Sequence, residues 1–229
     1  MLGADGPAAL EAGATPPTAT PPVLTPLRAV RAVTDSLGAG DVLVIGSSNP
    51  VRDVDLVHRW GGGAPAVVGN RGLAGIDGLV STATGVALAA ADAHPGRTVA
   101  LLGDVTFLHD VGGLLGAPGE PRADLTVVVV NDAGGSIFAG LEHGAVAQTS
   151  PARAAAFERV FSTPHTVDLR ALCAGYGVPH ERVTTAAALA AALAAPGAGT
   201  RVVEVAVGRA DRRALADAVA QAVRDALRP

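Results

Sequence analysis

Two short apolar runs, each followed by an aspartate, constrain this sequence more than any other feature. The first, Val99 to Leu102, ends at Gly103-Asp104. The second, Leu125 to Val130, ends at Asn131-Asp132, shortly before a glycine pair. Runs of this length are typical of buried strands and are too short to cross a membrane. Because ligands bind at the carboxyl ends of strands in open α/β sheets, we expect both aspartates at such an edge, where carboxylates suit a divalent cation holding a phosphate ester.

Strand-like and helix-like segments alternate along the rest of the chain. Thr25 can cap a helix that has Pro26 in its first turn. Residues 142–152 have no strong hydrophobic period, and we expect them to be mobile. This alternation predicts an α/β fold, a mainly parallel sheet with helices on both faces. Besides the two runs above, strands are expected at 42–45, 66–68, around 183 and at 201–207, and helices at 26–37, 49–57, 77–93, 110–115, 136–141, 168–174, 186–195 and 211–227.

Composition separates a tail from a domain. Residues 1–24 are rich in Pro, Ala, Gly and Thr without a hydrophobic period, so we predict a flexible linker followed by one domain at 25–229. Hydrophobic residues make up 49% of the chain, enough for a full core, and the formal net charge of −4 argues against a nucleic-acid partner. Without a signal peptide or an apolar run of membrane-spanning length, a cytoplasmic protein is expected. The single cysteine, Cys173, fits a buried apolar position.

Several motifs in a fixed order resemble one enzyme family. The pairs at 103–104 and 131–132, about thirty residues apart, resemble the thiamine-diphosphate motif usually written GDG…NN, with Val105 and Asp132 in place of its last glycine and second asparagine. GSSNPVR (46–52), NRGLAGIDG (70–78), GGSIF (134–138) and FSTPH (161–165) resemble the 2-succinyl-5-enolpyruvyl-6-hydroxy-3-cyclohexene-1-carboxylate synthases of menaquinone biosynthesis, the MenD family. The resemblance covers roughly Thr25 to the C-terminus and implies the diphosphate-binding domain of the thiamine-diphosphate-binding fold.

The resemblance implies a cofactor site. Mg²⁺ or Mn²⁺ would be held by the side chains of Asp104 and Asp132 and by the backbone carbonyl of Gly134, bridging to the diphosphate. Taken singly, each aspartate also fits an ordinary turn or helix cap. Phosphate oxygens would accept from backbone N–H groups or a hydroxyl, and apolar side chains would wall the thiazolium, although a plain core role is open for the latter. The cofactor-binding residues are Ile76, Gly103, Asp104, Val105, Thr106, Asn131, Gly134, Gly135 and Ile137.

The substrates implied by the resemblance, 2-oxoglutarate and isochorismate, both carry two carboxylates. Arg52 and Arg71 lie just past two expected strand ends, where guanidinium groups could bind carboxylates in bidentate geometry. Ser48 could donate to a substrate carboxylate or cap the following helix, and Phe138 could lie beside the substrate pocket or in the core. His109, His143 and His165 lie near no recognisable nucleophile motif, so we interpret them as structural, and Asp77 as a cap or loop residue.

No catalytic residue is expected in this chain. In the wider family a glutamate on an N-terminal pyrimidine-binding domain contacts the cofactor ring, and neither that domain nor the family's middle domain is recognisable here. We therefore interpret the chain as the C-terminal part of a thiamine-diphosphate-dependent carboligase, a transferase that decarboxylates 2-oxoglutarate and adds the product to isochorismate. It would be inactive alone and would require a homo-oligomer or a partner with the missing half. The alternatives are a domain of another thiamine-diphosphate decarboxylase or carboligase, and a non-catalytic cofactor-binding subunit.

Overall fold

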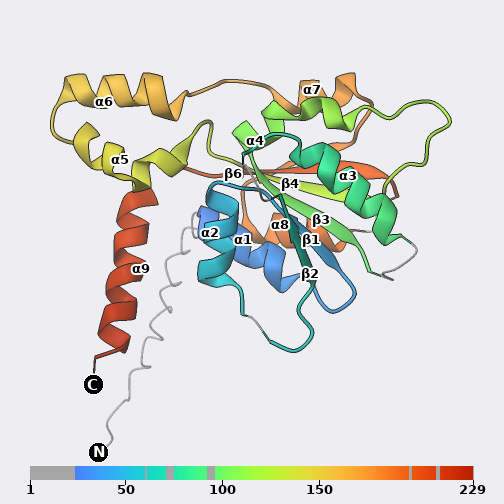
Figure 1. The fold of residues 1–229 in the computed structure, drawn as a ribbon, viewed down its shortest axis with the longest axis horizontal. Helices are drawn as coiled ribbons and strands as arrows, with labels where there is room; N and C mark the ends of the chain where they lie inside the picture. Colours follow the sequence, from blue (N-terminus) through green and yellow to red (C-terminus); the bar gives the residue numbers. More distant parts are fainter. Residues whose placement is uncertain are drawn as a thin grey trace, which may run out of the picture.

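A computed structural model describes residues 24–59, 61–70, 75–91, 96–195, 198–209 and 212–228. The expected linker, apart from its last residue, lies outside these ranges. Within them, strands form one parallel sheet in the order β2-β1-β3-β4-β6-β5 (Figure 1). The strands are β1 (Val42–Ile45), β2 (Ala66–Gly69), β3 (Thr98–Gly103), β4 (Leu125–Asn131), β5 (His180–Val183) and β6 (Thr200–Ala206).

Helices cover both faces of this sheet. Helices α1 (Pro26–Asp35), α2 (Asn49–Val57) and α8 (Ala186–Ala194) pack with Leu43, Leu101 and Val203 on one face. Helices α3 (Leu79–Ala90), α4 (Asp104–His109) and α7 (Leu169–Gly175) pack with Leu102 and Val129 on the other. Alternate residues of each strand therefore enter opposite cores, as the pleat of a two-sided sheet requires. The expected α/β architecture is confirmed.

The first helix starts as its sequence predicts. Thr25 Oγ1 accepts from the backbone N–H of Arg28 at 3.3 Å, and Pro26 occupies the first turn. Val30 and Val33 on its inner face are fully buried. Leu24, which we assigned to the tail, is also buried in this core at 4% exposure, so the packed region includes at least one more residue than expected.

The segment after β4 differs from expectation. In residues 142–152, where the sequence predicts no element, the structure has helix α5 (Glu142–Ala147) and the start of helix α6 (Pro151–Phe157). Ser150 caps α6 by accepting from the N–H of Arg153 at 3.3 Å, a local signal that a search for hydrophobic periods misses. Short 3₁₀ helices η1 (Val111–Leu114) and η2 (Ser136–Gly140) and a π-helical turn η3 (Glu158–Ser162) complete these connections.

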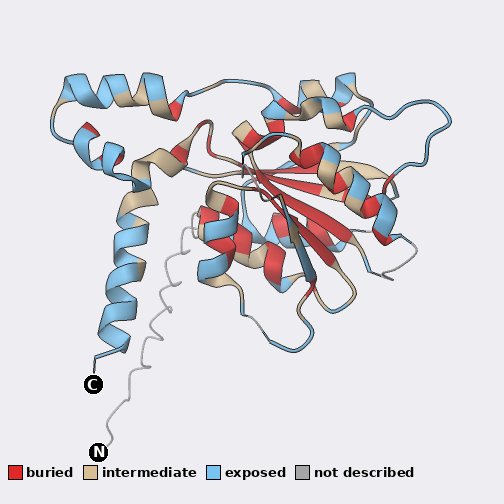
Figure 2. Cartoon of the chain, viewed as in Figure 1, coloured by how far each residue is buried: buried red, intermediate tan, exposed pale blue. Residues whose placement is uncertain are grey.

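Helix α9 (Arg212–Ala226) projects away from the sheet, and Figure 2 shows it and α6 as almost entirely exposed. Its apolar residues, expected to form one face of an amphipathic helix, are not buried in this chain. Arg213 anchors its first turn by donating to the carbonyls of Ala139 and Leu141, both at 3.0 Å. Among the described residues, no helix is long and apolar enough to cross a membrane.

Candidate functional site

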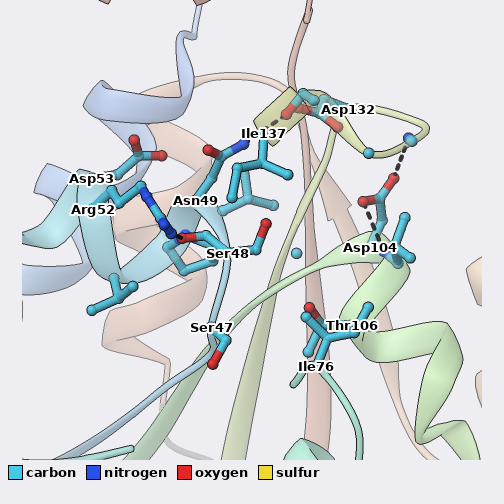
Figure 3. Close-up of a pocket in the computed structure, with 18 of the residues that line it drawn as sticks. Ser47, Ser48, Asn49, Arg52, Asp53, Ile76, Asp104, Thr106, Asp132 and Ile137 are labelled. Carbon is cyan, nitrogen blue, oxygen red and sulfur yellow. Dashed lines mark hydrogen bonds between the residues drawn. The ribbon is translucent and has the colours of Figure 1, made fainter. Parts of the chain in front are cut away.

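A cleft of about 660 Å³ lies at the carboxyl ends of β1, β3 and β4 (Figure 3). From β1 the chain continues to β2 on one side of it, whereas β3 lies on the other side of β1. The strand order therefore reverses here, and such a switch point is where open α/β sheets bind ligands. Asp104 follows β3, Asp132 follows β4, and Ser48 follows β1. The strand order therefore brings together residues that are far apart in the sequence.

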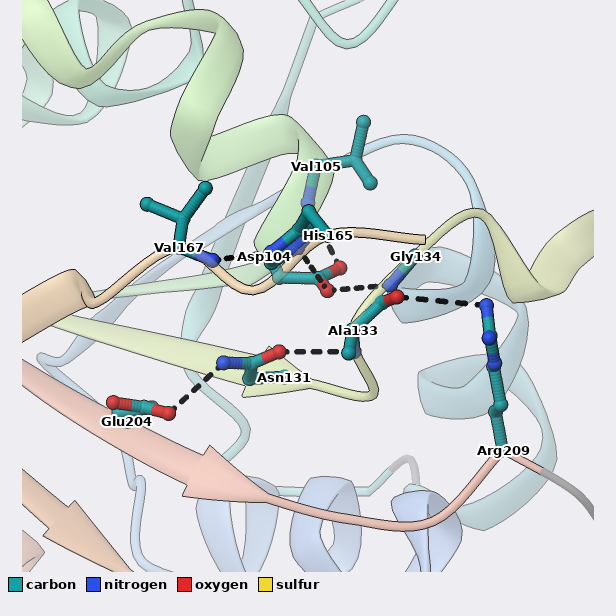
Figure 4. Close-up of polar contacts among 9 residues, drawn as sticks. All are labelled: Asp104, Val105, Asn131, Ala133, Gly134, His165, Val167, Glu204 and Arg209. Carbon is teal, nitrogen blue, oxygen red and sulfur yellow. Dashed lines mark hydrogen bonds and ion pairs between the residues drawn. The ribbon is translucent and has the colours of Figure 1, made fainter. Parts of the chain in front are cut away.

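Asp104 is 2% exposed and joins three separate segments (Figure 4). Its Oδ1 accepts from its neighbour Val105 N–H at 2.8 Å, and its Oδ2 accepts from Gly134 N–H at 2.8 Å. His165 Nε2 lies 2.9 Å from the same Oδ2. Burial raises the pKa of Asp104, and these hydrogen bonds, from Val105 first, oppose that effect. The carboxylate is thus held rigidly at the base of the cleft.

The contacts of His165 define how its ring meets Asp104. The backbone N–H of Val167 donates to His165 Nδ1 at 3.3 Å, so Nδ1 is the acceptor nitrogen. In the neutral ring the proton is then on Nε2, which donates to Asp104. The interpretation of His165 as merely structural is therefore incomplete, because its side chain orients a predicted metal ligand.

Asp132 is 9% exposed, and its pKa is raised to about 6. Burial is the main cause, and the nearby charge of Asp104 adds to it. A hydrogen bond from Ser136 and the positive charges of Arg212 and Arg209 act in the opposite direction. The two predicted ligands are therefore close enough to repel one another.

The backbone between Asp132 and the GGSIF motif is tightly constrained. Ala133 has φ of 60° and Gly134 has φ of 154°, conformations that few side chains accept. A Cβ on Gly134 would collide with the carbonyl oxygen of Ser162, and one on Gly135 would lie 2.8 Å from the carbonyl oxygen of Phe161. Glycine is required here because the FSTPH segment packs directly against this loop.

The end of β1 supplies the opposite wall. Ser48 has φ of 76°, a strained value for a serine, and its side chain makes no capping bond to α2. The capping role considered for Ser48 is therefore not observed in the structure. Arg52 is exposed and its Nη1 donates to the Ser48 carbonyl at 2.6 Å. Nearby, Asp53 accepts two hydrogen bonds of 3.0 Å from the guanidinium of Arg212, and this pair anchors the start of α9 at the wall of the cleft.

Most of the predicted site residues line this cleft. Two predicted residues are not among those that line it, and two predicted phosphate donors use their N–H groups in other hydrogen bonds. Arg71 lies outside the described residues. Asn131 is not in the cleft wall, because its side chain turns back toward Glu204 and the Ala133 N–H. The expected phosphate donors are also engaged: Val105 N–H binds Asp104, and Gly135 N–H donates to the Ser162 carbonyl at 2.7 Å. The predicted residues that line the cleft are Ser48, Arg52, Ile76, Gly103, Asp104, Val105, Thr106, Asp132, Gly134, Gly135, Ile137 and Phe138.

Sequence reasoning missed several residues of the site. Asn49 and Ser136 belong to motifs already recognised, and Asn49 Nδ2 donates to Ser136 Oγ at 2.8 Å across the cleft. Arg209 and Arg212 come after the last strand, where no local pattern marks them as neighbours of Asp132. Their position could be found only from the three-dimensional structure.

The remaining singled-out residues lie away from the cleft. The exposed side chains of His109 and Asp77 are 3.4 Å apart, so Asp77 is a loop residue and not a cap. The ring of His143 lies 4.8 Å from that of Phe161. Cys173 is a fully buried residue of α7, which confirms its core position.

The donor chemistry of the cleft fits a hard divalent cation. Two carboxylates whose burial raises their pKa face one cleft, and a bound cation would offset their mutual repulsion. Within the described parts of the chain, no group of three or more His, Cys, Asp or Glu side chains could hold a metal alone. Magnesium suits such a site because it often binds one or two carboxylates and takes its other ligands from water and phosphate.

Comparison with known proteins identifies related chains. Residues 63–207 match the family described as the thiamine pyrophosphate enzyme, C-terminal TPP binding domain. The chain is 54% identical over 195 residues to the 2-succinyl-5-enolpyruvyl-6-hydroxy-3-cyclohexene-1-carboxylate synthase of Nocardia farcinica, and 55% identical over 195 residues to that of Rhodococcus erythropolis. Each match covers 85% of this chain and 34% of the relative, so the chain spans about a third of their length.

Solved structures share the fold. Benzoylformate decarboxylase from Polynucleobacter necessarius matches 81% of this chain and 33% of its own with a TM-score of 0.64 and 19% identity. The thiamine diphosphate-dependent 4-hydroxybenzoylformate decarboxylase of Rhodococcus jostii matches 90% of this chain and 35% of its own with a TM-score of 0.58 and 20% identity. At this identity the likeness concerns the fold alone.

Proposed function

Because the chain belongs to the family of thiamine pyrophosphate enzyme C-terminal TPP binding domains, we propose that its cleft holds the diphosphate of thiamine diphosphate through a divalent cation. The observation that carries this proposal is the meeting of two buried carboxylates, Asp104 and Asp132, at the ends of neighbouring central strands. The side chains of both aspartates and the carbonyl of Gly134 would hold Mg²⁺ or Mn²⁺, and phosphate oxygens would complete its coordination.

The chain's own residues prepare this site. His165 and the Gly134 N–H fix Asp104 in one orientation, which reduces the cost of ordering a ligand when the cation binds. Ile76 and Ile137 line the cleft and would supply the apolar wall beside the thiazolium. When bound, thiamine diphosphate supplies the carbanion chemistry by which 2-oxo acids are decarboxylated and joined to an acceptor.

We further propose that the whole enzyme is a 2-succinyl-5-enolpyruvyl-6-hydroxy-3-cyclohexene-1-carboxylate synthase acting on 2-oxoglutarate and isochorismate. Relatives that are 54% and 55% identical bear this name. Arg52 on the cleft wall would bind a substrate carboxylate once it releases the Ser48 carbonyl. The Ser48 hydroxyl, which makes no capping bond to α2, would donate to the same carboxylate. Arg71 would act as a second carboxylate-binding residue, and Phe138 would border the acceptor.

The proposed active site also needs a group that this cleft lacks. Among the described residues, no glutamate lines it. A glutamate that contacts the cofactor ring would come from a pyrimidine-binding domain, in the same polypeptide or in another copy within a homo-oligomer. We therefore expect the 229-residue chain to bind cofactor weakly and to form no product by itself.

Titration calorimetry with thiamine diphosphate tests the cofactor site. We expect heat of binding in the presence of Mg²⁺ or Mn²⁺ and none with excess chelator. Asp104→Ala should weaken binding by at least about 100-fold, because it removes a ligand and its charge. Asp77→Ala is the matched control, since Asp77 is an exposed aspartate outside the cleft, and it should bind like the unmodified chain. Equal binding with and without chelator, or by Asp104→Ala, would refute the proposal.

A further inference from the structure

A buried polar cluster lies behind the cleft, on the face of the sheet that α7 covers. At its centre is Glu204 of β6, which is 6% exposed. Its Oε1 accepts from Asn131 Nδ2 at 2.9 Å and from Arg182 Nε at 3.2 Å. Its Oε2 lies 3.0 Å from Nε2 of His180, whose side chain is 3% exposed. None of these four residues lines the cleft.

The parallel register places these side chains together. Glu204 pairs with Arg182 of β5 on one side and with Val129 of β4 on the other. Asn131 is two residues beyond Val129, and His180 is two residues before Arg182, so all four side chains extend from the same face. Strand β6 therefore links the edge of the sheet to the strand that carries the proposed cation-binding loop.

Asn131 connects this cluster to the loop (Figure 4). Its Nδ2 donates to Glu204, and its Oδ1 accepts from the backbone N–H of Ala133 at 3.0 Å. The amide is thus oriented by both partners, because a flipped amide would point its oxygen at a carboxylate and its NH₂ at an N–H. Ala133 has φ of 60° and stands between Asp132 and Gly134, the two cation ligands that this loop would supply.

We propose that Glu204 is a positioning residue for the cation-binding loop, acting through Asn131. This inference rests on the proposed function, and it assigns a role to a glutamate that never touches the cofactor. By fixing the Asn131 amide, Glu204 holds Ala133 in its unusual conformation and keeps Asp132 and Gly134 in place before the cation arrives.

The chemistry of the cluster favours this role over simple stabilisation of the fold. A carboxylate in a strand whose other buried residues are all Val is costly to bury, and apolar residues often stabilise as well or better. A charged acceptor, however, forms a stronger and more directional bond to Asn131 than a neutral one. Residues that hydrogen-bond to metal ligands without touching the metal typically lower metal affinity by about 10–100-fold when they are removed.

Two variants cut the link at different points. Glu204→Leu removes the acceptor, and Asn131→Ala removes the connecting amide while leaving Glu204 paired with Arg182 and His180. Glu204→Gln keeps an oxygen that can accept from Asn131. Arg182→Ala is the matched control, because its half-exposed side chain contacts Glu204 but not the loop. If Glu204→Leu does not fold, Asn131→Ala carries the test.

Two measurements on the full chain decide the inference. Manganese affinity with thiamine diphosphate, measured by electron paramagnetic resonance, should fall about 10–100-fold in Glu204→Leu and Asn131→Ala, and no further in the double variant. Amide exchange at Ala133 in the cofactor-free chain should accelerate in the same variants. Glu204→Gln should largely restore both values, and Arg182→Ala should leave both unchanged.

Other results would overturn it. Unchanged exchange at Ala133 in Asn131→Ala would show that Glu204 does not hold the loop. Faster exchange with unchanged manganese affinity would show that the held conformation does not serve cation binding. If the unmodified chain binds neither manganese nor thiamine diphosphate, the proposed function fails, whereas the exchange data still decide whether Glu204 positions Ala133.

Discussion

Asp132→Asn should stabilise the cofactor-free chain at neutral pH, even though it replaces a residue of the proposed site. The pKa of Asp132 is raised from 3.8 to about 6, chiefly by burial. One pKa unit corresponds to about 1.4 kcal/mol, so ionisation of this nearly buried carboxyl costs the folded state about 3 kcal/mol relative to the unfolded chain. Asparagine has a similar shape, keeps an oxygen for the Ser136 hydroxyl and carries no charge, so it removes this cost.

The direction of the pH dependence follows from the raised pKa. The folded state binds the Asp132 proton more tightly than the unfolded chain does. Below 3.8 the carboxyl is neutral in both states and costs nothing. As pH rises from 3.8 to about 6, the unfolded chain loses its proton first, so the stability of the unmodified chain falls. Above about 6 the full cost is present.

Urea unfolding at a series of pH values measures this effect. We expect Asp132→Asn and the unmodified chain to differ little in unfolding free energy near pH 4, and the variant to be more stable by about 3 kcal/mol near pH 8. A difference that is the same at both pH values, or a less stable variant near pH 8, would refute the reasoning. It would mean that Arg209, Arg212 and Ser136 already compensate the ionised Asp132.

Binding of the cation should reverse the order of the two proteins. With Mn²⁺ and thiamine diphosphate in excess, the unmodified chain gains stability by mass action, and the variant gains less because it has lost a charged ligand. Manganese affinity of the unmodified chain should also fall below about pH 6, since a protonated carboxyl cannot ligate. Equal gains in both proteins would show that Asp132 does not hold the cation.

Three further outcomes are expected. Arg212→Ala leaves Asp53, which is 4% exposed, without its bidentate partner, and should lower the urea unfolding free energy by about 3–5 kcal/mol; a loss below about 1 kcal/mol would contradict the burial of this pair. Gly134→Ala places a methyl group against the Ser162 carbonyl and should abolish calorimetric binding of thiamine diphosphate, whereas retained binding would show that the loop can shift. The Cys173 thiol, with a pKa raised to about 11 by burial, should resist an aromatic disulfide reagent until urea is added, and rapid labelling of the native chain would contradict its buried position.

The strands and their order along the chain were predictable because buried parallel strands leave a strong local signal. Short runs of Val, Leu and Ile ended by Gly, Asn or Asp have few other interpretations. The same signal placed Asp104 and Asp132 at one edge of the sheet, since parallel strands share that edge. The structure confirms the sheet and brings both aspartates into one cleft.

Other features depend on contacts that leave no local pattern. Helix α6 starts at a Ser150 cap and buries none of its residues, so no hydrophobic period marks it. Asn131 was expected to face the cofactor, but its amide is matched by Glu204, a residue 73 positions away. Likewise, His165 meets Asp104 only because the chain returns to the cleft after η3. Long-range polar pairs of this kind are set by tertiary structure and cannot be read from spacing.

The two walls of the cleft differ in how they can move. Asp104 and Asp132 follow β3 and β4, which have hydrogen-bonded neighbours on both sides and mostly buried residues. Residues of η2 line the cleft as well, and the segment that continues from η2 through α6 buries only Ser136, Gly144 and Ala147. Segments with so few buried contacts open locally at low free-energy cost, whereas central strands open only near global unfolding. We therefore expect a molecule at this cleft to exchange by fast displacement of η2, while Asp104 and Asp132, the proposed cation ligands, stay fixed.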